Sequence, residues 1–149
     1  MNPDFPLNRW RHRVRIFDLD AYGHVNHTVF LQWLEEGRER LLREQGFSFL
    51  KFLQEGASLV MAHLNVDYKA SMAWGDEAIV ETRVARMGQT SLQFGQRVIS
   101  AKDTERVLEA EATMVFTSPA GRPVPIPPAV RKTFRTRPEE GDDADTWDA

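Results

Sequence analysis

Residues 26–46 read NHTVFLQWLEEGRERLLREQG, and this one segment sets the architecture expected for the whole chain. Apolar side chains recur in it at spacings of three and four residues, while charged residues fill most of the other side. That period is typical of an amphipathic helix with one face against a core. We therefore predict a helix from about Asn26 to Gln45, roughly 30 Å long, with Gly46 as its C-terminal stop.

Gly37 lies in the middle of the apolar stripe, where glycine costs about 1 kcal/mol of helix propensity relative to alanine. Close approach of the helix to another backbone would explain a glycine at this position. A shorter helical piece, Phe49–Glu55, is expected to follow the long helix.

The remaining periodic segments predict strands, because apolar and polar residues alternate in them with a period of two. In the first strand, His12, Val14 and Ile16 are expected on one face, and Arg11 and Arg13 on the other. Later strands are expected around residues 59–69, 78–84, 92–98 and 108–116, joined by short links that suit a meander. One strand, one long helix and four further strands indicate an α+β fold.

Prolines bound the folded part, since none lies between Leu7 and Ser118 and proline interrupts both strands and helices. We predict a single domain over 7–134 and an acidic, disordered tail over 135–149. The tail holds six acids and no base after residue 138, so the rest of the chain carries +3 against −3 overall. A mildly basic body suits a small anionic ligand and is too weakly charged to predict nucleic-acid binding.

Composition also narrows the location and the chemistry. The chain has no cysteine, which excludes disulfides, thiol catalysis and thiolate metal sites and suits a reducing cytoplasm. No apolar run approaches the roughly 20 residues that cross a bilayer, and the first residues do not resemble a signal peptide. We therefore expect a cytoplasmic protein without membrane partners.

Titratable residues concentrate just before the long helix, in the segment 18–27, which reads DLDAYGHVNH. Asp20 falls between the first strand and the helix, and the free N–H groups of the first helical turn begin near Asn26 and His27. Because a helix N-terminus carries unpaired donors and a partial positive charge, it can stabilise an oxyanion. The pattern predicts an oxyanion site beside these titratable groups, and capping of the helix turn is the structural role that it offers for the Asp20 carboxylate.

This segment resembles the 4-hydroxybenzoyl-CoA thioesterase family in its motif Asp-x-Asp-Ala-x-Gly-His-Val-Asn-His. The pieces DYKA at 67–70 and WGDE at 74–77 and the ending PVPIP at 123–127 agree with it. The resemblance covers about Arg9 to Phe134. It implies a hotdog fold, an antiparallel five-stranded sheet wrapped around one long helix, and homodimers or homotetramers with active sites between subunits.

The resemblance also implies roles for single residues. Asp20 corresponds to the family's catalytic aspartate, and the backbone N–H of His27 to the group that polarises the thioester carbonyl. The His27 imidazole matches a histidine that assists hydrolysis in bacterial relatives. Gly23, His24 and Asn26 are expected to position the oxyanion or the substrate, although Asn26 is equally suited to cap the helix.

Coenzyme A phosphates favour arginine and lysine, and Lys69 and Arg86 are candidates for that contact. The resemblance places Thr90 and Ser91 near the pantetheine path. The basic row of Arg9, Arg11, Arg13 and Arg15 is interpreted first as a solvated strand face paired with Glu109 or Glu111. No metal or other cofactor is expected, because Asp18, Asp20, His24 and His27 would have to close a metal site from both sides of one loop.

The predicted function is hydrolysis of an acyl-CoA thioester to a free acid and CoA, with Asp20 as nucleophile or base. A carboxylate with an ordinary pKa near 4 is a weak base, which favours nucleophilic attack or strong desolvation. The alternatives are a non-catalytic acyl-CoA-binding module and a hotdog hydratase or dehydratase. The long helix has no histidine after His27 and no proline, which disfavours the dehydratase.

Overall fold

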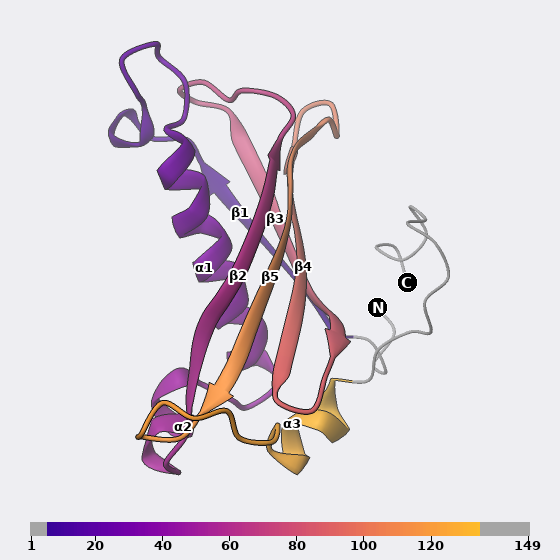
Figure 1. Ribbon diagram of the computed structural model, residues 1–149. Coiled ribbons are helices and arrows are strands. Elements are labelled where there is room, and N and C mark those ends of the chain that lie inside the picture. The colour runs from indigo at the N-terminus through magenta and orange to yellow at the C-terminus, as the bar shows by residue number, and fades with distance from the viewer. Residues whose placement is uncertain (1–5, 135–149) are drawn as a thin grey trace.

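The computed structural model describes residues 6–134, and the predicted tail 135–149 lies outside these described residues. No helix of this part is long and apolar enough to cross a membrane. The chain order, shown in Figure 1, is β1 (Leu7–Arg13), η1 (Ile16–Asp18), α1 (His27–Glu44), α2 (Phe49–Gln54), β2 (Ser58–Tyr68), β3 (Glu77–Met87), β4 (Ser91–Ser100), β5 (Arg106–Thr117) and α3 (Pro128–Thr133).

The prediction for the long helix is confirmed almost to the residue. The side chain of Asn26 accepts a hydrogen bond from the Thr28 N–H and caps the start of α1. At the other end, Gly46 has a positive φ of 85°, and the N–H of Phe47 donates to Leu42 O at 2.8 Å. This is the Schellman arrangement, which satisfies the last carbonyls of a helix and favours glycine.

All strand pairs are antiparallel, and the five strands lie in the order β1-β3-β4-β5-β2. The expected meander of strands two to five is therefore wrong for β2, which pairs with β5 at the far edge. Since β2 and β3 are not neighbours in the sheet, the link between them is not a hairpin. This link packs instead on the loop before α1. Met72 O accepts from the Val25 N–H at 2.8 Å, and Gly75 N–H donates to Val14 O at 3.2 Å.

The first strand also differs from its prediction. β1 ends at Arg13, and Ile16 lies in the single turn η1 with 63% of its surface exposed. Val14 is buried as expected. The alternation of apolar residues continues past the end of the strand, so periodicity alone set the strand boundary too late.

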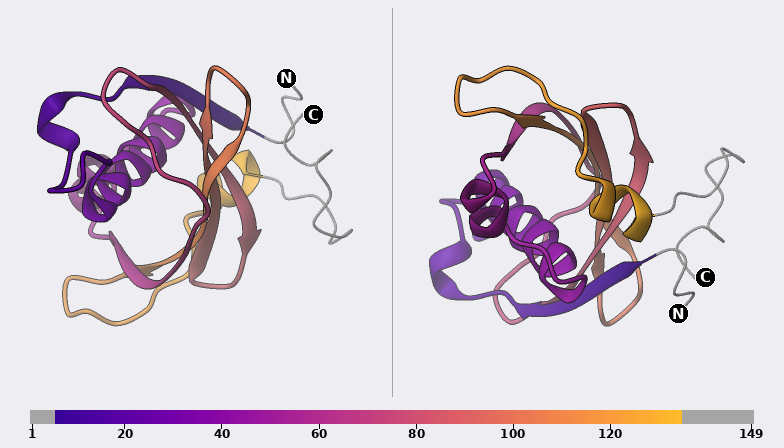
Figure 2. Two further views of the ribbon diagram at one scale, coloured as in Figure 1. Left: turned by 90° about the horizontal axis from the view of Figure 1, so that it is seen from above. Right: turned by 90° about the horizontal axis from the view of Figure 1, so that it is seen from below.

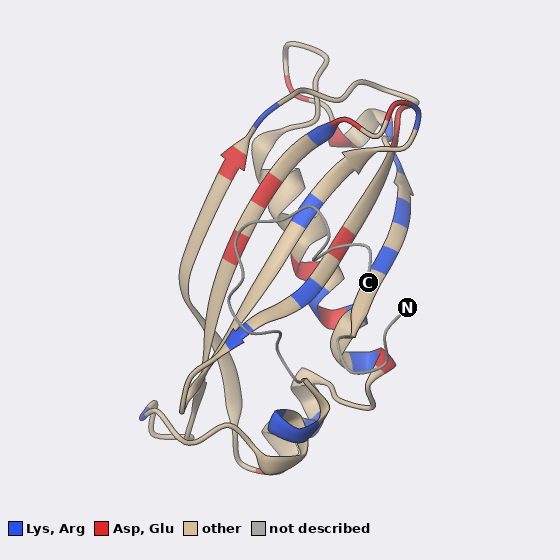
Figure 3. Cartoon of the chain, turned by 90° about the vertical axis from the view of Figure 1, so that its right-hand side faces the viewer, with Lys and Arg blue, Asp and Glu red and all other residues tan. Residues whose placement is uncertain are grey.

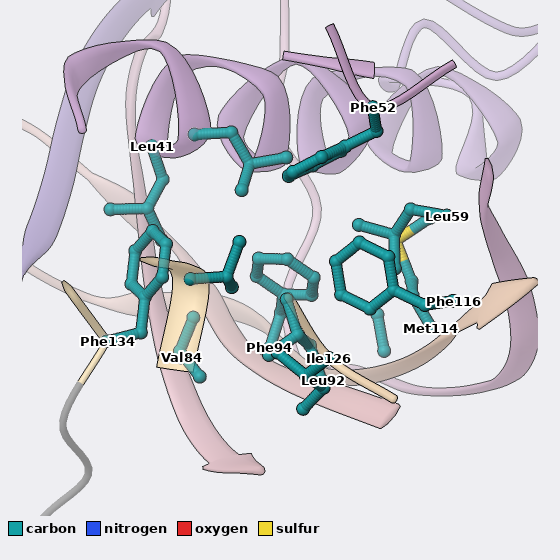
Figure 4. Packing of buried hydrophobic residues seen from close by; sticks show 13 residues of the cluster. Leu41, Phe52, Leu59, Val84, Leu92, Phe94, Met114, Phe116, Ile126 and Phe134 are labelled. Carbon is teal, nitrogen blue, oxygen red and sulfur yellow. The ribbon is translucent and has the colours of Figure 1, made fainter. Parts of the chain in front are cut away.

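The sheet curves around α1, which lies on its concave side in both end-on views of Figure 2. Side chains from α1, α2 and the inner sheet face fill the space between them. Figure 4 shows the half of this core near the end of α1, built from Leu41, Phe52, Leu59, Val84, Leu92, Phe94, Met114, Phe116, Ile126 and Phe134. A second cluster around Phe30, Trp33, Leu34, Val80 and Val98 fills the half near the start of α1.

Acidic and basic residues meet on the outer face of the sheet, away from α1 (Figure 3). Buried Glu81 accepts hydrogen bonds from Arg9 Nε at 2.6 Å and from Arg97 Nε at 2.8 Å. Arg11 pairs with Glu77 at 3.4 Å. Arg9 and Arg11 therefore find acids on β3, because β1 lies next to β3. The expected pairing with Glu109 or Glu111 is wrong, since β5 is not adjacent to β1.

Gly37 allows α1 to approach the sheet as closely as the sequence suggests. A Cβ at this position would lie 2.5 Å from Thr82 Oγ1, 3.2 Å from Gln96 Nε2 and 3.3 Å from Val80 Cγ1. These neighbours are side chains of β3 and β4, so the close contact is with the sheet's side chains and not with another backbone.

We expect Gly37→Ala to destabilise the fold despite the gain of about 1 kcal/mol in helix propensity. Overpacking of a buried contact typically costs about 1–3 kcal/mol, so the net free energy of unfolding in urea should fall. Gln32→Ala, an exposed position on α1, serves as the control and should change stability by less than about 0.5 kcal/mol. Equal stability of the two variants would contradict the close approach.

Candidate active site

The loop before α1 is closed on itself by backbone hydrogen bonds. The Asp20 N–H donates to His24 O at 2.7 Å, and the Gly23 N–H donates to Asp20 O at 3.1 Å. Gly23 has a φ of 77°, a conformation that residues with a Cβ rarely adopt. The predicted positioning role of Gly23 therefore has a structural basis, since this glycine lets the loop turn back toward the helix.

The Asp20 carboxylate takes part in the same turn. Its Oδ1 accepts hydrogen bonds from the Tyr22 N–H at 2.8 Å and from the His24 N–H at 3.2 Å. The expected alternative role, a cap on the helix turn, belongs instead to Asn26, whereas Asp20 caps the turn of the loop. Within residues 6–134, Oδ2 has no hydrogen bond, so one oxygen orients the carboxylate and the other stays available for chemistry.

The first turn of α1 leaves one backbone donor without an acceptor. Asn26 Oδ1 accepts from the N–H and the hydroxyl of Thr28 at 2.9 and 2.8 Å. Asn26 O accepts from the Val29 N–H at 2.9 Å and the Phe30 N–H at 3.3 Å. The His27 N–H has no acceptor among the described residues. This donor stands at the positive end of the helix dipole, where an oxyanion is stabilised.

Tyr68 holds the next peptide, between His27 and Thr28, and the sequence alone assigned it no role. Its hydroxyl donates to His27 O at 3.0 Å, and its ring lies edge-on to the His27 ring with centroids 6.4 Å apart. Burial raises the pKa of Tyr68, which keeps its hydroxyl protonated as a donor. In the sequence, only the DYKA piece at 67–70 includes this residue. Its contact with His27 is not visible there, because tertiary structure brings β2 and α1 together.

Asp18 anchors the loop to β1. It is only 3% exposed. Its Oδ2 accepts from the Arg15 N–H at 2.9 Å and lies 3.2 Å from His12 Nε2. Burial alone would raise the pKa of Asp18, but the hydrogen bonds from Arg15 and His12 outweigh it and lower the pKa. Its carbonyl accepts from the Asn26 N–H at 2.8 Å, so Asp18 also fixes the helix cap.

The remaining predicted site residues fall into two places. His24 is exposed and bridges Ala73 across the loop, and Lys69 follows β2 near His27, where it faces Glu109 at 3.7 Å. Arg86, Thr90 and Ser91 lie at the opposite end of the sheet, around the β3–β4 turn. One chain therefore does not bring the predicted coenzyme A residues together.

No three histidine, aspartate or glutamate side chains within residues 6–134 lie close enough to share a metal ion. The arrangement offers a carboxylate and an unpaired backbone N–H seven residues apart in the sequence and at the same end of the fold.

A five-stranded antiparallel sheet curved around one long helix, with an acidic loop at the start of that helix, defines the hotdog class of proteins. The sequence profile of the thioesterase-like superfamily matches residues 14–134. The chain belongs to that superfamily, as its motif predicts.

Similar proteins agree with this assignment. The chain is 32% identical to acyl-CoA thioester hydrolase YbgC of Escherichia coli, over 87% of this chain and 96% of that one. A thioesterase of Thermus thermophilus, solved with coenzyme A and Zn, is 35% identical with a TM-score of 0.75, over 89% and 99% of the two chains. Acyl-acyl carrier protein thioesterase ATL3 of Arabidopsis thaliana is 26% identical over 82% of this chain, which spans only 64% of the length of ATL3.

We expect Asp18→Asn to lower stability at neutral pH by about 1.5–3 kcal/mol, the usual size of hydrogen bonds to a charged group. Because the pKa of Asp18 is lowered below 3.8, its contribution is complete above that pH and is lost as the pH falls through the folded-state pKa. Urea unfolding between pH 7 and pH 2 should therefore show the wild type and Asp18→Asn converging in acid.

Glu111→Gln, an exposed change on β5, is the control and should differ little from the wild type at any pH. A gap between wild type and Asp18→Asn that stayed constant down to pH 2 would show that the charge of Asp18 stabilises nothing.

Proposed function

We propose that the protein hydrolyses acyl-CoA thioesters, with Asp20 and the His27 N–H as its reacting groups. The observation that carries the proposal is the His27 N–H at the start of α1, which has no acceptor among the described residues although Tyr68 and Asn26 fix the peptides around it. A fixed and unpaired donor at a helix N-terminus suits the oxygen of a thioester carbonyl as it becomes negative.

The chemistry follows from these groups. The carbonyl oxygen accepts from the His27 N–H, and Asp20 Oδ2 either attacks the carbonyl carbon or directs a water to it. The C–S bond then breaks, and the thiol leaves as a thiolate, since its pKa of roughly 8–9 resembles that of cysteine and makes a strong acid unnecessary. In the nucleophilic route, water cleaves the resulting anhydride, and the imidazole of His27 or His24 accepts its proton.

The active site is completed between two subunits in this proposal, within a homodimer or a homotetramer. β2 is an edge strand whose Val60, Met61 and Tyr68 are 43%, 41% and 47% exposed. Unpaired edges invite pairing with another strand. A two-fold pairing of β2 with its copy is antiparallel, so the β3–β4 turn of one subunit approaches the Asp20 end of the other. Thr90 and Ser91 would then reach the pantetheine path across the interface.

The relatives support the class of substrate. YbgC is an acyl-CoA thioester hydrolase, and the related Thermus structure contains coenzyme A. ATL3 acts on thioesters of acyl carrier protein, which carry the same phosphopantetheine arm, and this is the alternative donor. A cytoplasmic location belongs to the proposal, because a chain without cysteine suits a reducing compartment.

Asp20→Asn tests the central residue with little change of structure, because the amide oxygen of Asn can still accept from the Tyr22 and His24 N–H groups. We expect kcat/KM for thiol release from a panel of acyl-CoAs to fall by roughly 100- to 10,000-fold. Asp103→Asn, on the exposed β4–β5 turn, is the matched control and should keep full activity. A wild type that binds acyl-CoA but releases no thiol would favour the non-catalytic binding module. Equal rates for Asp20→Asn and Asp103→Asn would show that Asp20 takes no part in the reaction.

Val60→Lys tests the edge pairing, because a lysine on an edge strand opposes strand addition. We expect light scattering after gel filtration to show loss of the dimer, together with loss of thioesterase activity, while circular dichroism keeps the wild-type spectrum. Glu111→Lys adds a positive charge on the outer sheet face and should leave the mass unchanged. An active monomer would contradict sites shared between subunits.

A further inference from the structure

The outer face of the sheet, turned away from α1, is divided into a basic half and an acidic half. Val80, Val98 and Leu108 point inward to the core, and neighbouring residues of a strand point to opposite faces. The outward charged residues of β5 and β2 are all acidic, namely Asp67, Glu109 and Glu111. Those of β1, β3 and β4 are mostly basic, so blue and red bands separate across the sheet in Figure 3.

The basic half, called the arginine surface below, holds six arginines and two glutamates at the outward positions of β1, β3 and β4. These residues are Arg9, Arg11, Arg13, Arg83, Arg86, Arg97, Glu77 and Glu81. Both oxygens of Glu81 accept from arginine, at 2.6 Å from Arg9 Nε and at 2.8 Å from Arg97 Nε. Six positive charges against two negative charges give the arginine surface a net charge of +4. Such a surface attracts an acidic partner.

Within residues 6–134, no helix lies over the arginine surface. The helices α1 and α2 lie on the concave side of the sheet, and α3 lies at one end of the outer face (Figures 2 and 3). Arg131 Nη2 of α3 donates to Gly88 O at 2.6 Å, and the Ile126 N–H donates to Gln89 O at 2.9 Å. The described chain therefore ends, at the buried Phe134, beside the β3–β4 turn where the arginine surface begins.

The chain continues beyond this point for 15 residues, and the sequence of this segment is complementary in charge. Six acids and no base follow Pro138. They come 5 to 14 residues after Phe134, and an extended chain spans up to about 3.5 Å per residue, so they reach roughly 17 to 50 Å. From Ser91 to Ile99, which is level with Arg11, β4 covers about 26 Å. The acids can therefore reach the whole arginine surface.

The covalent link favours this segment over an acidic molecule from solution. A single exposed ion pair contributes little. Because the segment begins at the edge of the arginine surface, each contact after the first forms within one molecule and at a high effective concentration. Asp67, Glu109 and Glu111 repel the same acids from the other half of the face, which directs them across β4 and β3 toward β1.

We propose that the acidic segment 139–149 binds across the arginine surface of its own chain, from the β3–β4 turn to the edge strand β1. Its carboxylates accept charge-assisted hydrogen bonds from the outward guanidinium groups. The sheet thereby gains a cover on the face that the helices leave bare. This inference goes beyond the proposed thioesterase function and does not depend on it.

A spin label at the end of the chain tests the proposal, because the protein has no cysteine and Ala149→Cys provides a single attachment site. A nitroxide at this position broadens the amide NMR signals of nearby residues in the 15N-labelled full chain. At about 0.1 M salt, we expect the strongest broadening around Arg11 on β1 and its neighbours on β3. Broadening should weaken strand by strand toward β2, at the other edge of the sheet.

Two sets of charge changes in the labelled chain identify the contact. A neutral segment carries Glu139→Gln, Glu140→Gln, Asp142→Asn, Asp143→Asn, Asp145→Asn and Asp148→Asn, and it should lose the broadening. Arg11→Gln with Arg13→Gln should weaken it. The matched control, Arg43→Gln with Arg122→Gln, removes the same charge from exposed residues outside the arginine surface and should change nothing. Salt at about 1 M, which screens charges beyond about 3 Å, should abolish the broadening, and the amide spectrum itself reports that each variant is folded.

The proposal is wrong if the arginine surface is not broadened at low salt, which would leave this face to a partner from outside the chain. Broadening that the neutral segment keeps would overturn it as well. A sample that mixes unlabelled chains bearing the nitroxide with 15N-labelled chains lacking it distinguishes a second copy. Equal broadening in that mixture would place the segment on a neighbouring copy and contradict binding within one chain.

Discussion

The cap that Asn26 places on α1 is the interaction on which the rest of the site depends. A helix start offers several unpaired N–H groups, and Asn26 uses its side chain and its carbonyl to satisfy those of Thr28, Val29 and Phe30. The His27 N–H remains as the donor without an acceptor in the described chain. The same residue joins the start of α1 to η1, because its own N–H donates to Asp18 O at 2.8 Å. Fold and site therefore share one set of hydrogen bonds.

That cap is useful only if the helix itself cannot shift, and the packing of α1 on the sheet provides this. Gly37 brings the helix within contact distance of Thr82, Val80 and Gln96. The amide of Gln96 then joins α1 to both β3 and β4 through buried hydrogen bonds. Since each such group is costly to leave unpaired inside a protein, small rotations of α1 are opposed, and the His27 N–H keeps its direction.

The sequence predicted local features well and tertiary ones poorly, for a physical reason. The helix, its caps and the turn around Asp20 are set by neighbours within a few residues, so their signals lie together in the sequence, and the family and hotdog fold are confirmed. The placement of β2 beside β5 depends on a link that packs on the loop before α1, which no alternation of residues reveals. The Tyr68 contact with His27 arises only when distant segments meet. The roles assigned to Asp20 and His27 stay predictions.

The two groups that the proposed function uses lie on different elements, and this has a consequence for precision. Asp20 belongs to the loop and the His27 N–H to the start of α1, so their relative placement depends on how the loop is fixed to the rest of the fold. The Asn26 N–H donates to Asp18 O at 2.8 Å, and the Val25 N–H donates to Met72 O at 2.8 Å. These are backbone hydrogen bonds, which do not depend on the side chains of the residues that donate them. In the proposed enzyme the separation of the carboxylate from the oxyanion site is therefore set mainly by the backbone of the loop.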